Sequence, residues 1–405
     1  MTTLLDLDAT TPQNRSSYFA MDTISTGIGG ALLAKALPED WRGPRGTWAV
    51  TLASVVPDAD VFADFLSNDP LADLTQHRGF THSLVGVAVM APLLALLLWR
   101  FTRDKNYKRL LGLVTLGLLW HLFTDLSTSW GTMVFYPFNR DRVVWDWIFI
   151  IDFFFTGFLL LPQLLAWTYR ERDSGERAGA LRRGALLWGL LAAFAALVIR
   201  LVSPFFGANF QWGLLALVGG VLAAIFLAPA LGGWGFRQSR AAFCRIGVAV
   251  FAAYIGLCVV SHALAVRRVE QFLTSQQQAE ARHQVESLAA IPQPLSPFRW
   301  SGLILTSGGV YQSWFSVLDE NPPEFEFFPS AANDYVARAK EVSEAKTYLW
   351  FARFPVARYR AEGGRHIVEW TDRRFNAVRQ RNPAFVFRVV FNEQGQVLSA
   401  GFPEP

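Results

Sequence analysis

The sequence is poor in charged residues and has almost no cysteine. Only 17% of its 405 residues are charged, whereas soluble domains carry about 25%, so this composition argues for a membrane protein. The two cysteines, Cys244 and Cys258, lie in one apolar segment, which excludes a disulfide framework and a thiolate zinc site. The net charge of +4 is small for this length. Because the basic residues sit in short clusters between apolar runs, we predict no nucleic-acid partner.

Long apolar runs fill the chain up to about Val266. A membrane-spanning helix needs about 20 apolar residues, or somewhat fewer where it is buried in protein. Six segments fit this requirement: Thr81–Trp99, Leu110–Asp125, Trp145–Trp167, Ala185–Val202, Gln211–Leu231 and Ala242–Val266. Two shorter Gly/Ala-rich segments, Asp22–Leu37 and Gly46–Val56, suit helices packed inside a bundle, with re-entrant segments as the alternative. We therefore predict an all-α polytopic membrane bundle of about eight spans over residues 1–266.

Lys and Arg are concentrated in the loops on one side of this bundle. Sixteen basic residues lie in or beside the loops that follow the first, third, fifth and seventh spans, against three in the opposite short loops. Basic loops stay in the cytoplasm. The loops after the second, fourth and sixth spans are therefore expected to face outward, together with both termini.

The character of the sequence changes at about Arg267, and residues 267–405 are predicted to form a small extracytoplasmic α+β soluble domain. We expect a polar helix over Arg268–Leu288, a linker over Ile291–Pro297 and a helix over Ala331–Ala345. Short alternating runs predict strands at five positions. These are Trp300–Thr306, Val310–Val317, Thr347–Phe354, His366–Thr371 and Phe385–Asn392.

Histidine and aspartate gather in three short patches that lie far apart in the chain. The patches are Val56-Pro57-Asp58-Ala59-Asp60, His77-Arg78-Gly79-Phe80-Thr81-His82-Ser83 and His121-Leu122-Phe123-Thr124-Asp125. In the predicted topology each patch lies at the outward end of a span. The topology was set from Lys and Arg alone, so the convergence of the His and Asp patches is independent support for a site. The convergence predicts one metal site formed by Asp58, Asp60, His77, His82, His121 and Asp125.

Imidazole and carboxylate groups are suitable ligands for Zn²⁺, Mn²⁺ or Fe²⁺. His121 and Asp125 are four residues apart, which places them on one helix face within reach of one ion. Asp58 and Asp60 would add a bridging carboxylate for a second ion. Two ions about 3.5–4 Å apart would activate water and clamp a phosphoryl oxygen.

Two further residues are assigned supporting roles. Arg78 would neutralise a phosphate oxygen, and Asp152, in an aromatic run, would orient a histidine or belong to a proton or ion path. The plainer interpretation is that each patch holds ordinary helix-end and turn residues. Ionisable groups inside an apolar helix, as at His121 and Asp125, are costly and usually functional, which favours a site.

At these residues the chain resembles the YdjM-type metal-dependent hydrolases, also described as LexA-binding, inner membrane-associated proteins of bacteria. The resemblance covers about residues 21–165. It is carried by Met21–Thr26, Pro57–Asp60, His77–Ser83, His121 with Asp125, Thr128–Phe138 and Trp145–Asp152. The last two segments resemble a long form of the family that has an extra C-terminal domain. Nothing in the sequence supports a repressor contact.

This resemblance implies a metal-dependent hydrolase of the bacterial inner membrane, with the six His and Asp side chains as ligands. The His121-x-x-x-Asp125 element also resembles part of the zinc-dependent phospholipase C site, which implies zinc. Thr26 stands where some family members have histidine. One metal position is therefore expected to be lost or filled by water.

The favoured function is cleavage of a phosphoester, in a lipid or a lipid-linked phosphate, by metal-activated water at the outer membrane face. The partners expected are the bilayer itself and such a substrate. The alternative is a non-catalytic metal-binding membrane protein, or an ion or proton transporter. Transport requires ionisable residues spread through the depth of the membrane, whereas hydrolysis requires one cluster at one face.

Overall fold

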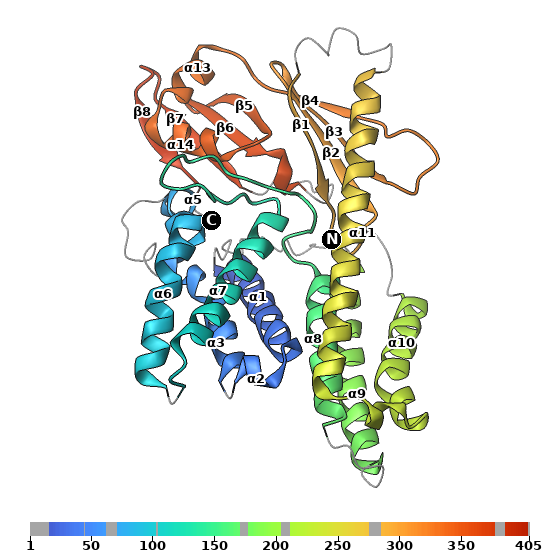
Figure 1. Ribbon diagram of the computed structural model, residues 1–405. Coiled ribbons are helices and arrows are strands. Elements are labelled where there is room, and N and C mark those ends of the chain that lie inside the picture. Colours follow the sequence, from blue (N-terminus) through green and yellow to red (C-terminus); the bar gives the residue numbers. More distant parts are fainter. Residues whose placement is uncertain are drawn as a thin grey trace, which may run out of the picture.

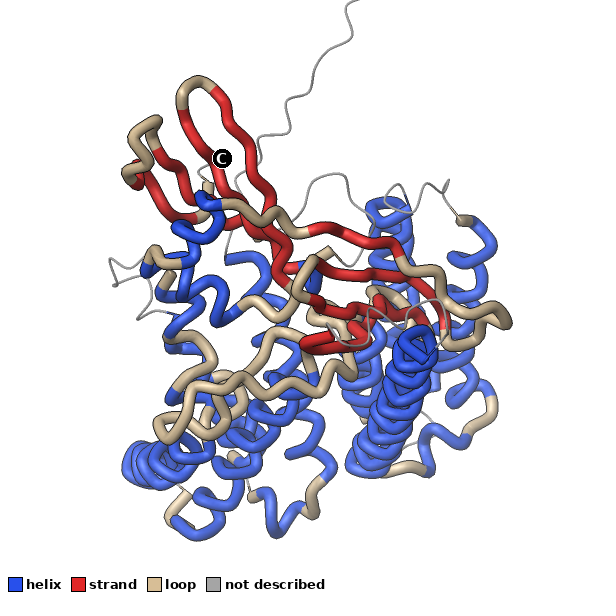
Figure 2. The backbone as a smooth tube through the Cα atoms, turned by 90° about the horizontal axis from the view of Figure 1, so that it is seen from above, coloured by secondary structure: helices blue, strands red, loops and turns tan. Residues whose placement is uncertain are grey.

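The computed structural model describes residues 16–43, 45–61, 71–102, 104–170, 177–203, 211–274, 285–376 and 385–403. Helices fill the lower part of Figure 1, and two β-sheets lie across the upper end of the helices. Seen from above in Figure 2, the strands lie over the helical layer. The C-terminal part of the chain therefore covers one end of the bundle.

The helical layer comes from the first two thirds of the chain. Its first elements are α1 (Ser16–Ala36), α2 (Glu39–Arg42), α3 (Gly46–Ala53), η1 (Val56–Asp60), α5 (Ala72–Thr75), η2 (Phe80–His82), α6 (Leu84–Phe101) and α7 (Tyr107–Ser127). After a long loop follow α8 (Phe153–Thr168), α9 (Arg177–Val202), α10 (Trp212–Leu231), η5 (Trp234–Arg237) and α11 (Arg240–Thr274).

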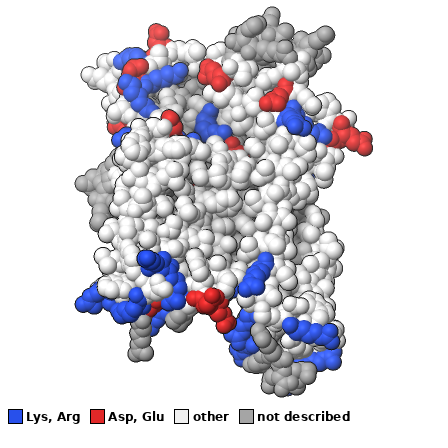
Figure 3. Space-filling model, in the orientation of Figure 1, with Lys and Arg blue, Asp and Glu red and all other residues white. Residues whose placement is uncertain are grey.

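Five helices in the described part of the chain are long and apolar enough to cross a membrane: α6, α7, α9, α10 and α11. α8 is also apolar but has 16 residues, and α3 has eight. Figure 3 shows a broad uncharged band, with Lys and Arg gathered at its lower end and charges of both signs at its upper end. These features support a multi-pass membrane protein, but they do not confirm the predicted eight spans.

α7 is the central helix of the group that also contains α1, α3 and α6. Gly117 allows α3 to approach closely, because a Cβ atom there would lie 2.5 Å from the carbonyl oxygen of Val50. Small residues at such contacts are typical of helices packed in membranes. Buried Leu110, Leu113 and Val114 fill the same contact region. This packing fixes the upper end of α7 relative to η1, which follows α3.

The C-terminal part contains two antiparallel four-stranded sheets. The first is formed in order by β1 (Val285–Pro292), β2 (Arg299–Thr306), β3 (Gly309–Ser316) and β4 (Glu326–Pro329). The second is formed by β5 (Pro355–Glu362), β6 (Arg365–Asp372), β7 (Val386–Phe391) and β8 (Val397–Gly401). α13 (Asp334–Lys340) and α14 (Ser343–Phe351) lie between the sheets in sequence, and η7 (Arg373–Phe375) follows β6.

Some predicted boundaries in this part are wrong. Val285–Pro292 is a strand, not the end of a polar helix and the start of a linker. Residues 275–284 of the predicted helix lie outside the described residues. The segment predicted as a strand at Thr347–Phe354 falls largely in α14, whose Tyr348 and Phe351 pack into the core that this helix shares with β6 and β7.

Candidate metal centre

α7 carries two buried ionisable side chains near its upper end. His121 and Asp125 are each 1% exposed. The Nδ1–H of His121 donates to the carbonyl oxygen of Ser54, at the end of α3, over 2.8 Å. Because a carbonyl oxygen can only accept, Nδ1 carries a proton, and in the neutral ring Nε2 keeps its lone pair. Nε2 therefore faces the cluster as a potential metal ligand.

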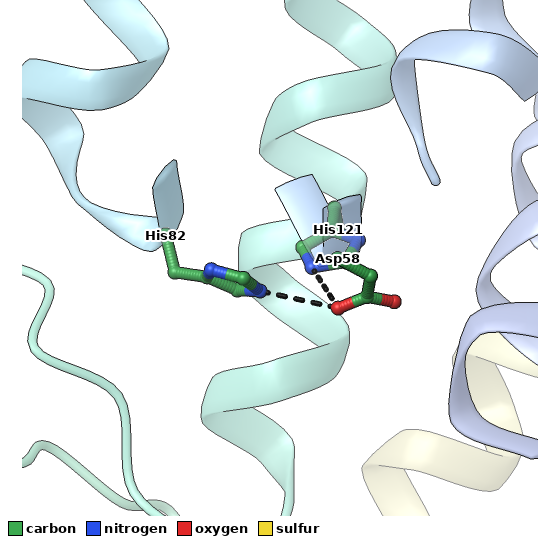
Figure 4. A group of neighbouring side chains, drawn as sticks. All are labelled: Asp58, His82 and His121. Carbon is green, nitrogen blue, oxygen red and sulfur yellow. Dashed lines mark hydrogen bonds and ion pairs between the residues drawn. The ribbon is translucent and has the colours of Figure 1, made fainter. Parts of the chain in front are cut away.

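η1 brings Asp58 to the same place, immediately after α3. Its Oδ1 lies 3.2 Å from Nε2 of His82 and 3.4 Å from Nε2 of His121, as Figure 4 shows. Its other oxygen accepts a hydrogen bond from the hydroxyl of Thr23 in α1. Asp58 thus joins α1, η1, η2 and α7 at one point.

Four ligand atoms form a ring in which nitrogen and oxygen alternate. Besides the two contacts of Asp58, Oδ2 of Asp125 lies 3.3 Å from Nε2 of His82 and 3.5 Å from Nε2 of His121. A tetrahedral zinc ion with bonds of about 2.0–2.1 Å would hold its ligand atoms roughly 3.3–3.4 Å apart. Nε2 of His121 and Oδ2 of Asp125 are buried and have no hydrogen-bond partner. The ligand atoms of Asp58, His82 and His121 all lie within 4.8 Å of one another and could hold a divalent cation, with Oδ2 of Asp125 beside them.

Asp60 and His77 form a second layer behind His82. Oδ1 of Asp60 lies 3.0 Å from Nδ1 of His77, and its Oδ2 lies 3.2 Å from Nδ1 of His82. The hydroxyl of Thr81 donates to the same Oδ2 over 2.9 Å. Burial alone would raise the pKa of Asp60, but hydrogen bonds from the His77 and His82 rings hold this pKa well below its usual range.

The structure thus brings together all six predicted side chains, five of them in two groups that share His82, with Asp125 against the first group. Asp58, His82 and His121 form one group of potential ligands, and Asp60, His77 and His82 form another. Three carboxylates and the guanidinium of Arg78 are buried here. With neutral imidazoles their net charge is −2, which is costly to bury without a compensating cation.

Comparison with known proteins gives the same assignment as the motifs. Residues 21–203 match the family model described as YdjM inner membrane protein. Over this stretch the chain is similar to the YdjM family. The chain is 33% identical to Inner membrane protein YbcI of Escherichia coli (strain K12) over 122 residues, which are 30% of this chain and 66% of YbcI.

It is also 27% identical to Uncharacterized protein YfhP of Bacillus subtilis (strain 168) over 153 residues, which are 36% of this chain and 45% of YfhP. The chain therefore spans less than two thirds of each of these relatives. No solved structure matches it. All six His and Asp side chains lie inside the YdjM region, whereas both sheets lie beyond its end at residue 203.

Arg78 lies against the cluster rather than in an open position. It has a left-handed backbone conformation with φ 59°. Its Nη2 lies 3.2 Å from Oδ1 of Asp125, and its Nη1 donates to the hydroxyl of Thr128 over 3.0 Å. The side chain is buried, at 6% exposure. Arg78 therefore contacts Oδ1 of Asp125, while Oδ2 of the same carboxylate faces the histidines.

Asp152 belongs to neither group of ligand atoms. Its carboxylate caps the start of α8 by accepting from the backbone N–H groups of Phe154 and Phe155. It also accepts a hydrogen bond of 2.6 Å from the hydroxyl of Tyr254 in α11. These contacts place Asp152 at the α8–α11 junction.

Sequence reasoning missed three polar contacts of the centre. Thr23 holds Asp58, Ser54 holds His121, and Thr81 holds Asp60. Thr23 and Thr81 were within reach, since both fall in the motifs that resemble the YdjM family. Ser54 acts through its backbone carbonyl, which carries no sequence signal. Thr26 lies nearby, with its hydroxyl 3.2 Å from that of Thr124.

Proposed function

We propose that this chain is a metal-dependent hydrolase of the inner membrane that cleaves a phosphoester, in a lipid or a lipid-linked phosphate, at the outer face. The observation that carries the proposal is the alternating ring of two imidazole nitrogens and two carboxylate oxygens, spaced 3.2–3.5 Å apart. Two histidines and two carboxylates suit zinc, and manganese or iron are the alternatives.

In this proposal Asp58, His82, His121 and Asp125 hold the ion. Catalysis requires one position on the ion to stay open to water. Zinc bound there would act as a Lewis acid and activate that water near neutral pH. Asp60 keeps the proton of His82 on Nδ1, as Ser54 does for His121, so that both Nε2 atoms can bind metal. Arg78 serves to position Asp125. Asp60 and His77 are then orienting partners rather than ligands of a second ion.

Exposed apolar side chains beside the cluster support a lipid substrate. Phe80, which is part of η2 with His82, is 42% exposed, and Leu84 at the start of α6 is 48% exposed. The backbone N–H of Leu84 donates to the carbonyl of Val134, which brings Phe135 alongside, at 50% exposure. Asp58 is the most exposed of the four ligands, at 16%. An apolar rim around a polar centre suits a headgroup whose acyl chains stay in the bilayer.

The position of the cluster also favours hydrolysis over transport. Its residues lie near the end of α7 that is covered by the C-terminal part, not in a file along the helices. We further propose that α1, α3 and α8 complete eight spans over residues 1–266, and that residues 267–405 lie outside the membrane. The basic ends of the helices in Figure 3 would then face the cytoplasm.

The test is metal analysis and phosphodiester hydrolysis by the purified full chain in detergent. We expect about one zinc ion per chain, together with hydrolysis of a fluorescent phospholipid that stops on chelation and returns with zinc. His82→Ala and His121→Ala should lose both properties. His366→Ala, in β6, is the matched control and should keep them. Wild-type protein with no more metal than His121→Ala would overturn the proposal.

A further inference from the structure

The loop between α7 and α8, residues 128–152, lies between the metal centre and the C-terminal sheets; we call it the connecting loop. On its inner side the N–H of Met133 donates to the carbonyl of Arg78 over 3.0 Å. Thr128 accepts a hydrogen bond from the Arg78 guanidinium. Arg78 in turn engages Oδ1 of Asp125 and leaves Oδ2 directed at the histidines. The loop thus determines how Asp125 faces the centre.

The connecting loop also completes the end of α7. The N–H of Trp145 donates to the carbonyl of Leu126, and those of Trp147 and Ile148 both donate to the carbonyl of Ser127. The last carbonyl groups of a helix have no partner within the helix. Because these carbonyls directly follow Asp125, the segment around Asp146 supports the turn that carries this ligand.

On its outer side the loop is held by arginines of the C-terminal part. Arg353 forms two parallel hydrogen bonds with the Asp146 carboxylate, at 3.0 and 2.9 Å. Arg374 donates from Nη1 to the carbonyls of Ser129 and Trp130, at 3.0 and 3.3 Å. Its own Nε is fixed by Asp372 at 2.7 Å. Paired fork geometry of this kind is both strong and directional.

Aromatic packing joins the same two parts. The Trp130 ring lies 5.1 Å from Phe351 and 5.6 Å from Phe375. From the loop itself, Arg142 lies over the rings of Trp350 and Phe351 in α14. Arg142 also donates to the carbonyl of His77. Arg142 therefore links α14 to the segment that carries His77, Arg78 and His82.

We propose that the C-terminal part positions the metal centre through the connecting loop, with Arg353 and Arg374 as positioning residues that touch neither metal nor substrate. This inference rests on the metal site proposed above. It concerns a part of the chain beyond the YdjM match. Its prediction is that breaking a contact with the loop weakens metal binding although all four ligands are present.

The experiment measures zinc affinity of the purified full chain by competition with a chromogenic chelator. Arg353→Met removes the paired bonds to Asp146, and we expect zinc affinity to fall about tenfold, as for other outer partners of metal ligands. Arg353→Lys keeps the charge but not the paired geometry, and we expect its zinc affinity to lie between those of Arg353→Met and wild type. Arg374→Met should act like Arg353→Met, but it is deeply buried, so the Arg353 pair is the primary test.

The matched control is Arg388→Met, which removes an ion pair with Glu369 between β7 and β6 and has no contact with the loop among the described hydrogen bonds. Unchanged zinc affinity in Arg353→Met, with metal-binding wild type, overturns this inference and leaves the proposed function standing. Equal weakening by Arg353→Met and Arg388→Met also overturns it, because the effect would then be general destabilisation. Wild type that binds no zinc removes both proposals.

Discussion

Asp60→Asn separates the two ways in which the six side chains can hold metal. In the structure Asp60 accepts from Thr81 at 2.9 Å and faces the Nδ1 atoms of His77 and His82 at 3.0 and 3.2 Å. Asparagine has nearly the same shape but only one accepting oxygen, and its NH₂ group would face an N–H donor. The substitution therefore removes the charge and at least one acceptor while leaving Asp58, His121 and Asp125 untouched.

The expected loss of zinc affinity in Asp60→Asn follows from the position of Asp60 behind His82. A hydrogen bond to a charged group is worth about 1.5–3 kcal/mol, and only the part that differs between metal-bound and metal-free protein changes affinity. Partners that orient a metal-binding histidine typically contribute about 10–100-fold in affinity, or roughly 1.4–2.7 kcal/mol. We therefore expect zinc to bind about 10–100-fold more weakly, with the ratio of metal to protein unchanged near one.

The assay combines metal analysis at saturation with a chelator titration for affinity. Asp141→Asn, an exposed aspartate in the connecting loop, is the control and should match wild type in both. If Asp60 were a direct ligand of a second ion, wild type would hold two ions and Asp60→Asn one. That result would refute the assignment of Asp60 as an orienting partner of His82, and so would an Asp60→Asn protein with wild-type affinity.

Two further substitutions test the surroundings of the centre. Gly86→Ala would place a Cβ atom 1.9 Å from the carbonyl oxygen of Phe80, so η2 and His82 must shift; we expect lower zinc content by metal analysis and a loss of about 1–3 kcal/mol of stability in thermal unfolding. Unchanged zinc content would contradict this. Asp152→Asn should keep both the helix cap and the zinc, whereas Asp152→Ala should cost about 1 kcal/mol of stability and leave zinc content unchanged; loss of zinc in Asp152→Asn would instead assign that residue to the centre.

The convergence of the three patches was predictable from the sequence because antiparallel spans force alternate loops to one end. Ionisable residues inside an apolar helix were also recognisable, because burying them in a bilayer is costly. The division of the six side chains into an inner ring and an outer layer was not predictable. It depends on which nitrogen of His82 faces Asp60, and neither spacing nor residue type determines that.

Contacts between distant parts of the chain were also beyond sequence reasoning. Asp146 lies in an aromatic run that was predicted to begin a span, yet it pairs with Arg353, 207 residues away. The structure places this run in a loop, and α8 begins at Phe153, after its cap at Asp152. In the C-terminal part, periodicity found β2, β3, β6 and β7. It missed β1, β4, β5 and β8. The sequence of β1, Val285–Pro292, does not alternate clearly between apolar and polar residues.

The position of the connecting loop gives a physical reason for the proposed dependence of the centre on the C-terminal part. Backbone that is not helical is tolerated at membrane depth only where it is buried in protein or lines a water-filled cavity. α7 supplies carbonyl partners for the second half of this loop, and Arg374 supplies donors for its first half. Without the C-terminal part, the carbonyls of Ser129 and Trp130 would lose these donors, next to the segment that holds Arg78 against Asp125. We therefore propose that the contacts that cover the loop also hold the proposed metal ligands in place.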